Sequence, residues 1–275
     1  MYFLSDGIAG LIYHVLGYRK EVVMQNLLIA FPEKTEKERI QIAKAFYLNF
    51  TDTFIETIKL LSISEKGLRK RFSSNIEVVD AFYDQGVDVQ LEAGHFFNWE
   101  FINLGVSKYG RYPFVGVYMP VSNKAVNRIM MQLRSRYGTI LIPATDFRNK
   151  FREYAKDRYS LGLAADQNPG NPANAHWVYF FNRLTPFVTG PEKGAKLNNI
   201  PVIFANFYKK KRGYYHIQFE VITTEPRTFE EGKLTQVFAS YVEKAIKQIP
   251  DNYLWSHKRW KWEFDEEKYG DRVIK

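Results

Sequence analysis

Two rhythms of apolar residues divide this chain. Between residues 40 and 61, apolar side chains recur at steps of three and four, which is the period of an α-helix. Thr35 and Glu38 stand just before that run with the spacing of a capping box, so we predict that the helix begins there. From about residue 76 the pattern changes to short apolar or alternating segments separated by helical ones, which is typical of an α/β sheet.

The second rhythm predicts where the strands and helices lie. We expect strands at residues 76–79, 87–93, 113–117, 139–142, 159–165, 177–181, 201–207 and 214–221. We expect helices at residues 100–106, 124–137, 147–156, 192–197 and 230–249. This order predicts an α/β fold with a central mixed, mostly parallel sheet flanked by helices, and with an N-terminal helical hairpin packed on it. Residues 1–72 are expected to form that helical region, which packs on the core or anchors it to a membrane, and residues 73–275 one continuous α/β core.

One predicted strand is unusually polar. Asp88, Gln90 and Glu92 alternate with apolar residues, whereas a parallel strand covered on both faces should be almost entirely apolar. We therefore expect this strand near an edge of the sheet, or with one wetter face.

The charge balance predicts an anionic partner. The chain has 39 Lys+Arg against 30 Asp+Glu, a formal charge of +9 and a pI near 9.4. Lipid headgroups, a phosphorylated substrate, an acidic carrier protein and nucleic acid all fit that charge. The absence of cysteine excludes disulfides, cysteine nucleophiles and zinc–thiolate sites.

The most apolar segment lies near the start of the sequence. Residues 7–18 are apolar but interrupted by His14, and no stretch reaches the roughly 18 to 20 apolar residues that span a bilayer. We interpret the segment as an amphipathic surface helix or the tail end of a longer anchor.

The candidate chemistry begins at Gly94-His95-Phe96-Phe97-Asn98-Trp99-Glu100, directly after a predicted strand. A neutral imidazole can take a proton from an alcohol near pH 7, and a carboxylate can orient the imidazole. His95 and Glu100 can converge if His95 lies in the turn and Glu100 in the first turn of the next helix. Gly94 would allow the bend, and Asn98 or Asn103 would supply turn or cap chemistry. The spacing alone is weak, since a histidine at a strand end is commonly structural.

Four ordered blocks make the chain resemble the bacterial lipid A biosynthesis acyltransferases, within the glycerolipid acyltransferase superfamily and its His-x4-Asp/Glu motif. The first block is the histidine motif. The other blocks are Gly17-Tyr18-Arg19-Lys20 with Asn26-Leu27 and Ala30-Phe31-Pro32-Glu33; Asp166-Gln167-Asn168-Pro169 with Trp177-Val178-Tyr179-Phe180-Phe181, Gly190 and Pro201-Val202; and Tyr253-Leu254-Trp255-Ser256-His257-Lys258-Arg259-Trp260-Lys261.

The resemblance implies an acyltransferase for groups other than aminoacyl groups. It would move a fatty acyl chain from acyl–acyl carrier protein to a hydroxyl of a lipid A precursor, late in lipopolysaccharide biosynthesis. His95 would be the general base and Glu100 would hold its imidazole. The acyl donor is carried on the phosphopantetheine of the carrier protein, so the resemblance implies neither a cofactor nor a metal in this chain.

The same resemblance implies partners and a location. We expect the acyl carrier protein, the lipid A precursor or a related glycolipid and a membrane surface as partners, no nucleic acid, and a monomer. The expected place is the cytoplasmic face of the inner membrane. Attachment would be peripheral, or through an N-terminal anchor that is weak or missing in this chain.

Four further residues are candidate substrate ligands. Arg134 and Arg136 lie on a basic helix that also carries Arg128, and the alternative is a solvated basic face. A guanidinium can hold a phosphate through two parallel hydrogen bonds. Asp166 and Gln167 follow a strand, where ligand crevices open in α/β sheets. Asp166 would orient Arg134 or the acceptor sugar, or else only cap a turn.

Two other basic segments are interpreted differently. Residues 209–213 are expected to be a solvated hairpin turn. Residues 257–262 mix cations with tryptophans, which suits a membrane interface or single-stranded nucleic acid, and the resemblance favours lipid. For residues 177–181, a buried strand is preferred over a lining of an acyl channel by Phe180 or Phe181.

Alternatives to this function stay open at the level of the sequence. The acceptor could be another membrane glycolipid or aminolipid, or water, as in a thioesterase. The non-enzymatic alternative is a basic peripheral membrane-binding or nucleic-acid-binding protein in which His95 is structural.

Overall fold

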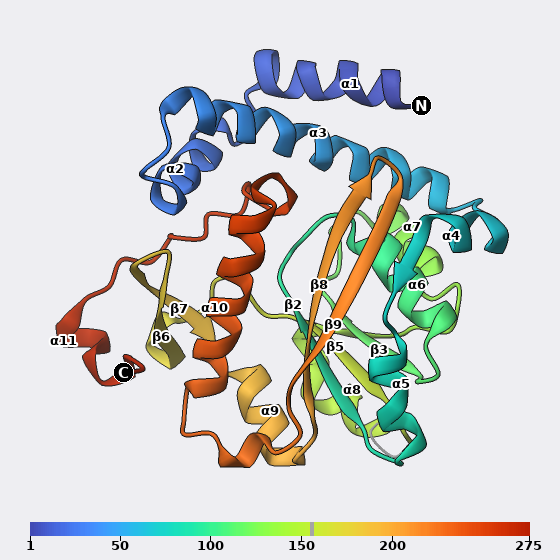
Figure 1. The fold of residues 1–275 in the computed structure, drawn as a ribbon, viewed down its shortest axis with the longest axis vertical. Coiled ribbons are helices and arrows are strands. Elements are labelled where there is room, and N and C mark those ends of the chain that lie inside the picture. The colour runs from blue at the N-terminus through green and yellow to red at the C-terminus, as the bar shows by residue number, and fades with distance from the viewer. Residues whose placement is uncertain (155–156) are drawn as a thin grey trace.

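The computed structural model describes residues 1–154 and 157–275. Figure 1 shows a twisted sheet with helices on both faces and a layer of N-terminal helices lying across one end of it. The predicted α/β class is confirmed.

A seven-stranded sheet forms the centre, with the strand order β1-β9-β8-β2-β5-β3-β4. Only β8 and β9 pair antiparallel, as a hairpin, so the sheet is mixed and mostly parallel. A separate antiparallel pair, β6 and β7, stands beside it. The strands are β1 Phe72–Ser74, β2 Val89–Ala93, β3 Phe114–Tyr118, β4 Ile140–Pro143, β5 Ser160–Ala164, β6 Ala175–Phe180, β7 Arg183–Val188, β8 Val202–Lys211 and β9 Tyr214–Thr223.

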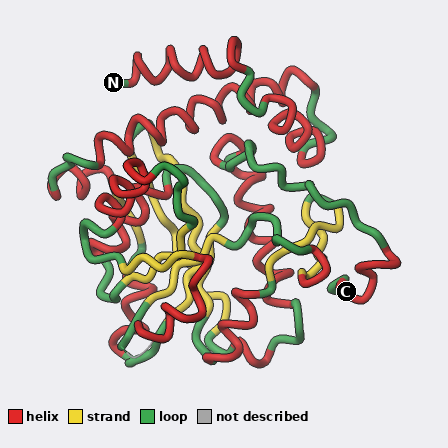
Figure 2. The backbone as a smooth tube through the Cα atoms, turned by 180° about the vertical axis from the view of Figure 1, so that it is seen from behind, coloured by secondary structure: helices red, strands yellow, loops and turns green. Residues whose placement is uncertain are grey.

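Helices cover both faces of this sheet, as the rear view in Figure 2 also shows. On one face, Phe238 and Tyr241 of α10 pack on Phe204 of β8. On the other, Phe101 of α6 packs on Tyr215 of β9. The α-helices are α1 Tyr2–Leu11, α2 Lys20–Ala30, α3 Glu36–Leu60, α4 Glu65–Arg71, α5 Glu77–Asp84, α6 Trp99–Tyr109, α7 Lys124–Arg134, α8 Phe147–Tyr154, α9 Gly190–Asn198, α10 Lys233–Gln248 and α11 Glu266–Tyr269.

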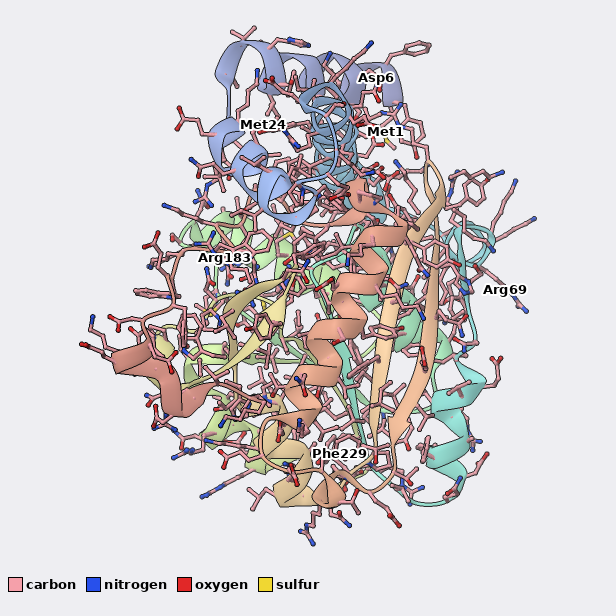
Figure 3. All side chains as sticks on the ribbon, turned by 60° about the vertical axis from the view of Figure 1, so that its left-hand side comes forward. Met1, Asp6, Met24, Arg69, Arg183 and Phe229 are labelled. Atoms are coloured by element: carbon pink, nitrogen blue, oxygen red, sulfur yellow. The ribbon has the colours of Figure 1, made fainter. Side chains whose placement is uncertain are left out.

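The long helix α3 begins where the sequence predicts. The Thr35 side chain accepts a hydrogen bond from the Glu38 backbone N–H, and the Glu38 carboxylate accepts one from the Thr35 N–H, which completes the capping box. A π-helical turn, Ile12–Leu16, extends α1. Figure 3 shows Asp6 on α1 and Met24 on α2 within this N-terminal layer.

The predicted strand at residues 76–79 is wrong. The segment is the start of α5, because Val79 and Phe82 are buried one helical turn apart and outweigh the β-branched run. The helices α4, α5 and α11 and the strands β1 and β7 were not predicted. The predicted helix at 147–156 is α8, and its last two residues lie outside the described part of the chain.

The predicted edge position of β2 is also wrong. This strand lies between β8 and β5, and both Gln90 and Glu92 are buried. The Gln90 amide donates to the Glu92 carboxyl (2.7 Å) and to the carbonyl of Pro191 (3.0 Å). Burial and the nearby charge of Glu192 raise the pKa of Glu92 to about 7, so the polar face is satisfied inside the protein rather than by water.

The hairpin of β8 and β9 has the predicted position, and Lys210 and Lys211 are exposed as predicted, but Lys209 and Arg212 are held by the protein. Its Arg212 guanidinium pairs with the carboxylates of Asp52 on α3 and Asp6 on α1, each at 2.6 Å. Lys209 donates to the side chain of Asn49. These contacts fasten the N-terminal layer to the sheet.

Helix α1 presents its apolar side to solvent. Ser5 and Ala9 face the protein, and the Ser5 hydroxyl donates to Asp52 (2.6 Å). Phe3 is 93% exposed, and Leu4 and Leu11 are exposed beside it. Among the residues that the structure describes, no helix combines the length and the apolar character needed to cross a bilayer.

Candidate active site

The histidine motif lies at the C-terminal ends of the parallel strands, directly after the central strand β2. Strand β2 stops at Ala93, and Gly94 bends the chain so closely that a Cβ there would lie 2.9 Å from the Phe96 ring. Helix α6 then begins at Trp99, and the Asn98 side chain caps it by accepting from the N–H groups of Glu100 (3.1 Å) and Phe101 (3.4 Å). His95 therefore sits in a strand-to-helix turn, as predicted.

The partner of His95 is Asp166. Its Oδ1 lies 2.5 Å from His95 Nδ1. The contact follows from strand order, because Ala93 of β2 and Ala164 of β5 are register partners, and both residues lie two positions beyond that pair. Asp166 is fully buried, whereas the His95 side chain is 25% exposed. Asp166 thus holds the imidazole at Nδ1 from inside the protein, while part of the ring is exposed to solvent.

The charge state of Asp166 defines the tautomer of His95. Burial alone would raise the pKa of this carboxyl, but the charge of His95 and the hydrogen bond from it outweigh burial and lower the pKa to about 2. An ionised carboxylate only accepts, so the proton in the short contact belongs to Nδ1. In the neutral form of His95, Nε2 is then the lone-pair nitrogen, as a general base requires.

Glu100 does not contact His95. Its carboxylate pairs with the guanidinium of Arg134 instead, at 3.0 Å from Nε and 2.5 Å from Nη2, and it also accepts from the indole of Trp99 (3.0 Å). The predicted contact between Glu100 and His95 is therefore replaced by two separate pairs. One joins the turns after β2 and β5, and the other joins α6 to the last turn of α7.

Arg136 and Gln167, the other two predicted substrate ligands, belong to neither pair. Arg136 donates to the carbonyls of Leu60 (2.9 Å) and Ile63 (2.7 Å), so its guanidinium fastens the end of α3. Gln167 is half-buried next to Asp166. Substrate binding by Arg136 and Gln167 stays a prediction, and the contacts of Arg136 do not favour it.

The C-terminal segment 252–260, which we name the strap, closes the site from one side. The N–H of Leu254 donates to the carbonyl of His95, and the N–H of Phe97 donates to the carbonyl of Asn252, both at 3.1 Å. Trp255 and Trp260 are buried, and Arg259 is fully buried. The interpretation of residues 257–262 as a membrane-interface motif is thus wrong for Arg259 and Trp260. Phe180 and Phe181 of the aromatic run are also buried, as expected.

The strap also holds the loop that follows Asp166. The N–H of Asn168 donates to His257 Nε2 (3.2 Å), and Arg259 donates to the side-chain oxygen of Asn168 (3.0 Å). Burial, followed by the charge of Arg259, lowers the pKa of His257 from 6.5 to about 4. His257 is therefore neutral near pH 7, which leaves Nε2 free to accept.

The pH dependence of stability should report on His257. The unfolded chain protonates this imidazole below about pH 6.5, but the folded protein does so only below about pH 4. Between these values the unfolded state binds more protons, so the free energy of unfolding should fall as the pH is lowered from about 6.5 to about 4. Urea unfolding at pH 7 and pH 5 measures this fall. It should be smaller in His257→Gln, and an equal fall in both proteins would contradict the assignment.

The residues that sequence reasoning missed come mainly from the strap. Tyr253, His257 and Arg259 lie around Asp166, and the negative charge of Asp166 adds to burial in raising the pKa of Tyr253 well above its ordinary range. The sequence contained one usable signal. Aromatic residues that alternate with cations, as in this segment, can also indicate a packed segment in which a buried charge has a partner.

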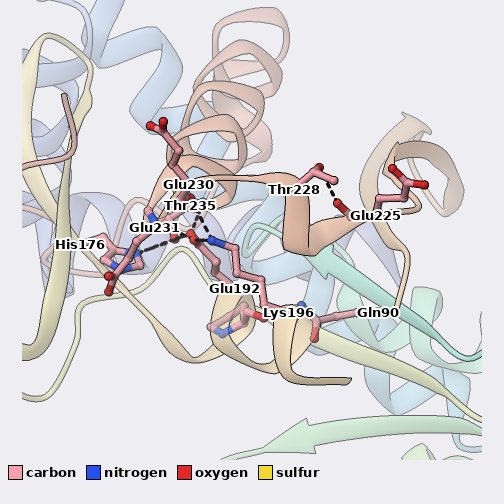
Figure 4. Close-up of polar contacts among 11 residues, drawn as sticks. Gln90, His176, Glu192, Lys196, Glu225, Thr228, Glu230, Glu231 and Thr235 are labelled. Atoms are coloured by element: carbon pink, nitrogen blue, oxygen red, sulfur yellow. Dashed lines mark hydrogen bonds and ion pairs between the residues drawn. The ribbon is translucent and has the colours of Figure 1, made fainter. Parts of the chain in front are cut away.

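A second polar cluster is structural. Figure 4 shows Glu192 of α9 at its centre, with Lys196, Thr235 and His176. The Glu192 carboxylate accepts from the N–H groups of Gly232 (2.7 Å) and Thr235 (3.0 Å), so it caps α10, whose own cap position is glycine. No predicted site residue belongs to this cluster. Within residues 1–154 and 157–275, no group of three or more His, Cys, Asp or Glu is arranged to hold a metal ion.

Comparisons with known proteins agree with the resemblance found in the sequence. The chain matches the family model for bacterial lipid A biosynthesis acyltransferases over residues 1–262. It is 24% identical over 277 residues to a lipid A biosynthesis lauroyltransferase of Escherichia coli (strain K12), which covers 95% of this chain and 85% of the relative. A palmitoleoyltransferase of the same strain is 21% identical over 261 residues, with 94% and 84% covered. A lipid A biosynthesis acyltransferase of Haemophilus influenzae (strain ATCC 51907 / DSM 11121 / KW20 / Rd) is 25% identical over 270 residues, with 96% and 85% covered.

Proposed function

We propose a reaction from the premise that this chain belongs to the bacterial lipid A biosynthesis acyltransferase family. The chain is an acyltransferase of lipid A biosynthesis. The finer proposal is that it moves a fatty acyl chain from the thioester of an acyl carrier protein to a hydroxyl group of a lipid A precursor. The observation that carries the proposal is the partly exposed imidazole of His95 held by the buried carboxylate of Asp166.

The step proceeds through the free nitrogen of His95. Nε2 removes the hydroxyl proton as the oxygen attacks the thioester carbonyl, and Asp166 stabilises the imidazolium that forms. When the tetrahedral intermediate collapses, the carbon–sulfur bond breaks and the imidazolium gives its proton to the departing thiolate. The products are an ester and a free thiol, so atoms and charge balance without an outside reactant.

The pair of Glu100 and Arg134 supports a neighbouring role. Glu100 occupies Nε and Nη2 of the guanidinium, and the Arg134 side chain remains 20% exposed. A cation fixed this rigidly can meet an anionic group of the substrate without a further loss of side-chain freedom. We keep Arg134 as the candidate phosphate ligand and assign Glu100 to its orientation.

The location proposed for the protein is a lipid surface, reached through α1. The outward apolar side of this helix continues into exposed Val15 and Leu16, and the exposed cation Lys20 follows them, 4.3 Å from the Tyr13 ring. Apolar side chains next to a basic one suit the headgroup region of an anionic bilayer.

Replacing Phe3 with glutamate should weaken binding to vesicles of phosphatidylcholine and phosphatidylglycerol by about tenfold or more. The reason is that a phenylalanine buried in the bilayer contributes roughly 1.5–3 kcal/mol to the free energy of binding. Cosedimentation measures it. Leu197→Glu is the matched control, since Leu197 is 77% exposed on α9, at the opposite end of the molecule in Figure 1. Equal binding of both variants would exclude α1 as the docking helix.

The function is tested by acyl transfer in detergent. Lauroyl–acyl carrier protein is the donor, and a tetra-acylated or penta-acylated lipid A precursor, an unrelated glycolipid, an aminolipid and water are offered as acceptors. Ester formation on the lipid A precursor supports the proposal. Transfer only to another lipid would change the acceptor, and hydrolysis alone would make the protein a thioesterase.

A further inference from the structure

Two of the four sequence blocks that resemble the family carry no reacting group, yet the fold connects both to the His95–Asp166 pair. They are the early block, which contains Arg19 and Asn26, and the C-terminal block, which forms most of the strap. The strap connects the early block to the pair. It forms hydrogen bonds with the turn that carries His95 and with the loop after Asp166, and side chains of the early block hold the strap.

The strap touches the His95 turn through its backbone. Leu254 donates to the carbonyl of His95 itself, and Asn252 accepts from the N–H of Phe97. Phe96 and Tyr253 face each other as an isolated antiparallel bridge. The turn that carries His95 therefore has a strand-like partner in the strap.

The same strap holds the Asp166 loop at Asn168. Three polar groups of this residue are used: the backbone N–H by His257, the amide N–H by the carbonyl of Lys258 (2.6 Å) and the side-chain oxygen by Arg259. The relative position of His95 and Asp166 thus depends on where the strap lies.

Helix α2 sets the position of the strap. The Asn26 amide donates to the carbonyls of Trp255 and His257, both at 2.7 Å, and Asn26 is buried. Arg19, at the start of α2, donates to the carbonyl of Ser256 (2.9 Å). Three successive carbonyls of the strap are therefore fixed by two side chains that lie more than two hundred positions earlier in the sequence.

We infer that Asn26 and Arg19 are positioning residues for the His95–Asp166 pair, acting through the strap. The inference rests on the proposed function of that pair. Proton transfer depends steeply on geometry, and a displacement of about 1 Å can reduce a rate by about 10²-fold. Releasing the strap loosens its contacts with the His95 turn and with the Asp166 loop together. The release should therefore slow the chemical step more than it weakens substrate binding.

The test compares Asn26→Ala with a matched control, Asn75→Ala. Asn75 also makes two hydrogen bonds with backbone groups, to the carbonyl and the N–H of Phe219 (2.9 and 2.7 Å), but it lies between β1 and α5, away from the strap. Both variants are assayed with lauroyl–acyl carrier protein and the tetra-acylated precursor, below their unfolding transitions. Asn26→Ala should lower kcat at least tenfold with KM within twofold of wild type, and Asn75→Ala should leave both unchanged.

A second readout needs no substrate. The proton of His95 Nδ1 in its short contact should give a downfield proton NMR signal, assigned by its absence in His95→Asn. Asn26→Ala should shift or broaden that signal. Arg19→Met, at an exposed position, should produce a smaller change of the same kind, which Arg19→Lys should restore.

The outcomes separate the inference from the function. If Asn26→Ala keeps its kcat and its signal, or if both alanine variants lose activity in proportion to lost stability, the positioning role is overturned. Should Asn26→Ala not fold, Arg19→Met decides by the same criteria. If wild type transfers no acyl group while the NMR signal responds as expected, the proposed function fails and the positioning role stands.

Discussion

Replacing His95 with asparagine is expected to lower kcat for acyl transfer by about 10³-fold, within the range of about 10²–10⁴ that a general base contributes. The asparagine amide can still donate to Asp166, so the buried carboxylate keeps a partner and the fold is retained. It offers no nitrogen that can take a proton from an alcohol. The measurement is transfer from lauroyl–acyl carrier protein to the lipid A precursor, with urea unfolding as the control for folding.

A folded His95→Asn protein with more than a tenth of the wild-type kcat would contradict the general-base role. It would return His95 to a structural residue at a strand end, as in the non-enzymatic alternative. His95→Ala serves as a second variant, although it leaves the buried Asp166 without a partner and should be less stable.

The second large effect is expected from Asp166→Asn, compared with Glu100→Gln. An asparagine amide at position 166 can donate to Nδ1, which favours the tautomer that carries its proton on Nε2. That tautomer cannot act as the base, so kcat should fall by about 10³-fold with little change in KM. Glu100→Gln keeps the partner of His95 and removes a charge opposite Arg134. It should cost stability, about 3 kcal/mol for a broken buried pair, and lower kcat much less.

The comparison decides which carboxylate serves His95. Both proteins are measured well below their unfolding transitions, over a range of pH. If Glu100→Gln abolished transfer while Asp166→Asn remained active, Glu100 would be the partner during catalysis and the contact with Asp166 would be a feature of the resting state only.

The position of His95 was predictable because its signals are local. A period-two strand, a glycine and a capping asparagine together define a strand-to-helix turn, and the structure has each of them. The partner was not predictable from spacing along the chain. Glu100 is five residues away and faces Arg134, whereas Asp166 is 71 residues away and adjacent through the register of β2 and β5. Strand order, which the sequence pattern leaves open, decides between them.

Burial of polar residues was the other source of error. Gln90 and Glu92 were interpreted as signs of an edge or a wetter face, and Arg259 and Trp260 as part of a lipid contact. Partners remote in sequence accept or donate the hydrogen bonds that allow this burial, such as Pro191 for Gln90, Asn168 and Pro186 for Arg259, and Thr185 for Trp260. A pattern of hydrophobic and polar positions records the type of each side chain but not the identity of a distant partner.

The dependence of the site on the strap has a consequence for how the protein matures during its synthesis. The ribosome releases α2 first, then His95, then Asp166, and the strap only after all of them. A growing chain can form the N-terminal helices and most of the sheet while the strap's place against Asn26 is still unfilled. We expect such a chain to be compact before it is competent for transfer, and proteolytic removal of the strap should return a finished molecule to that immature state.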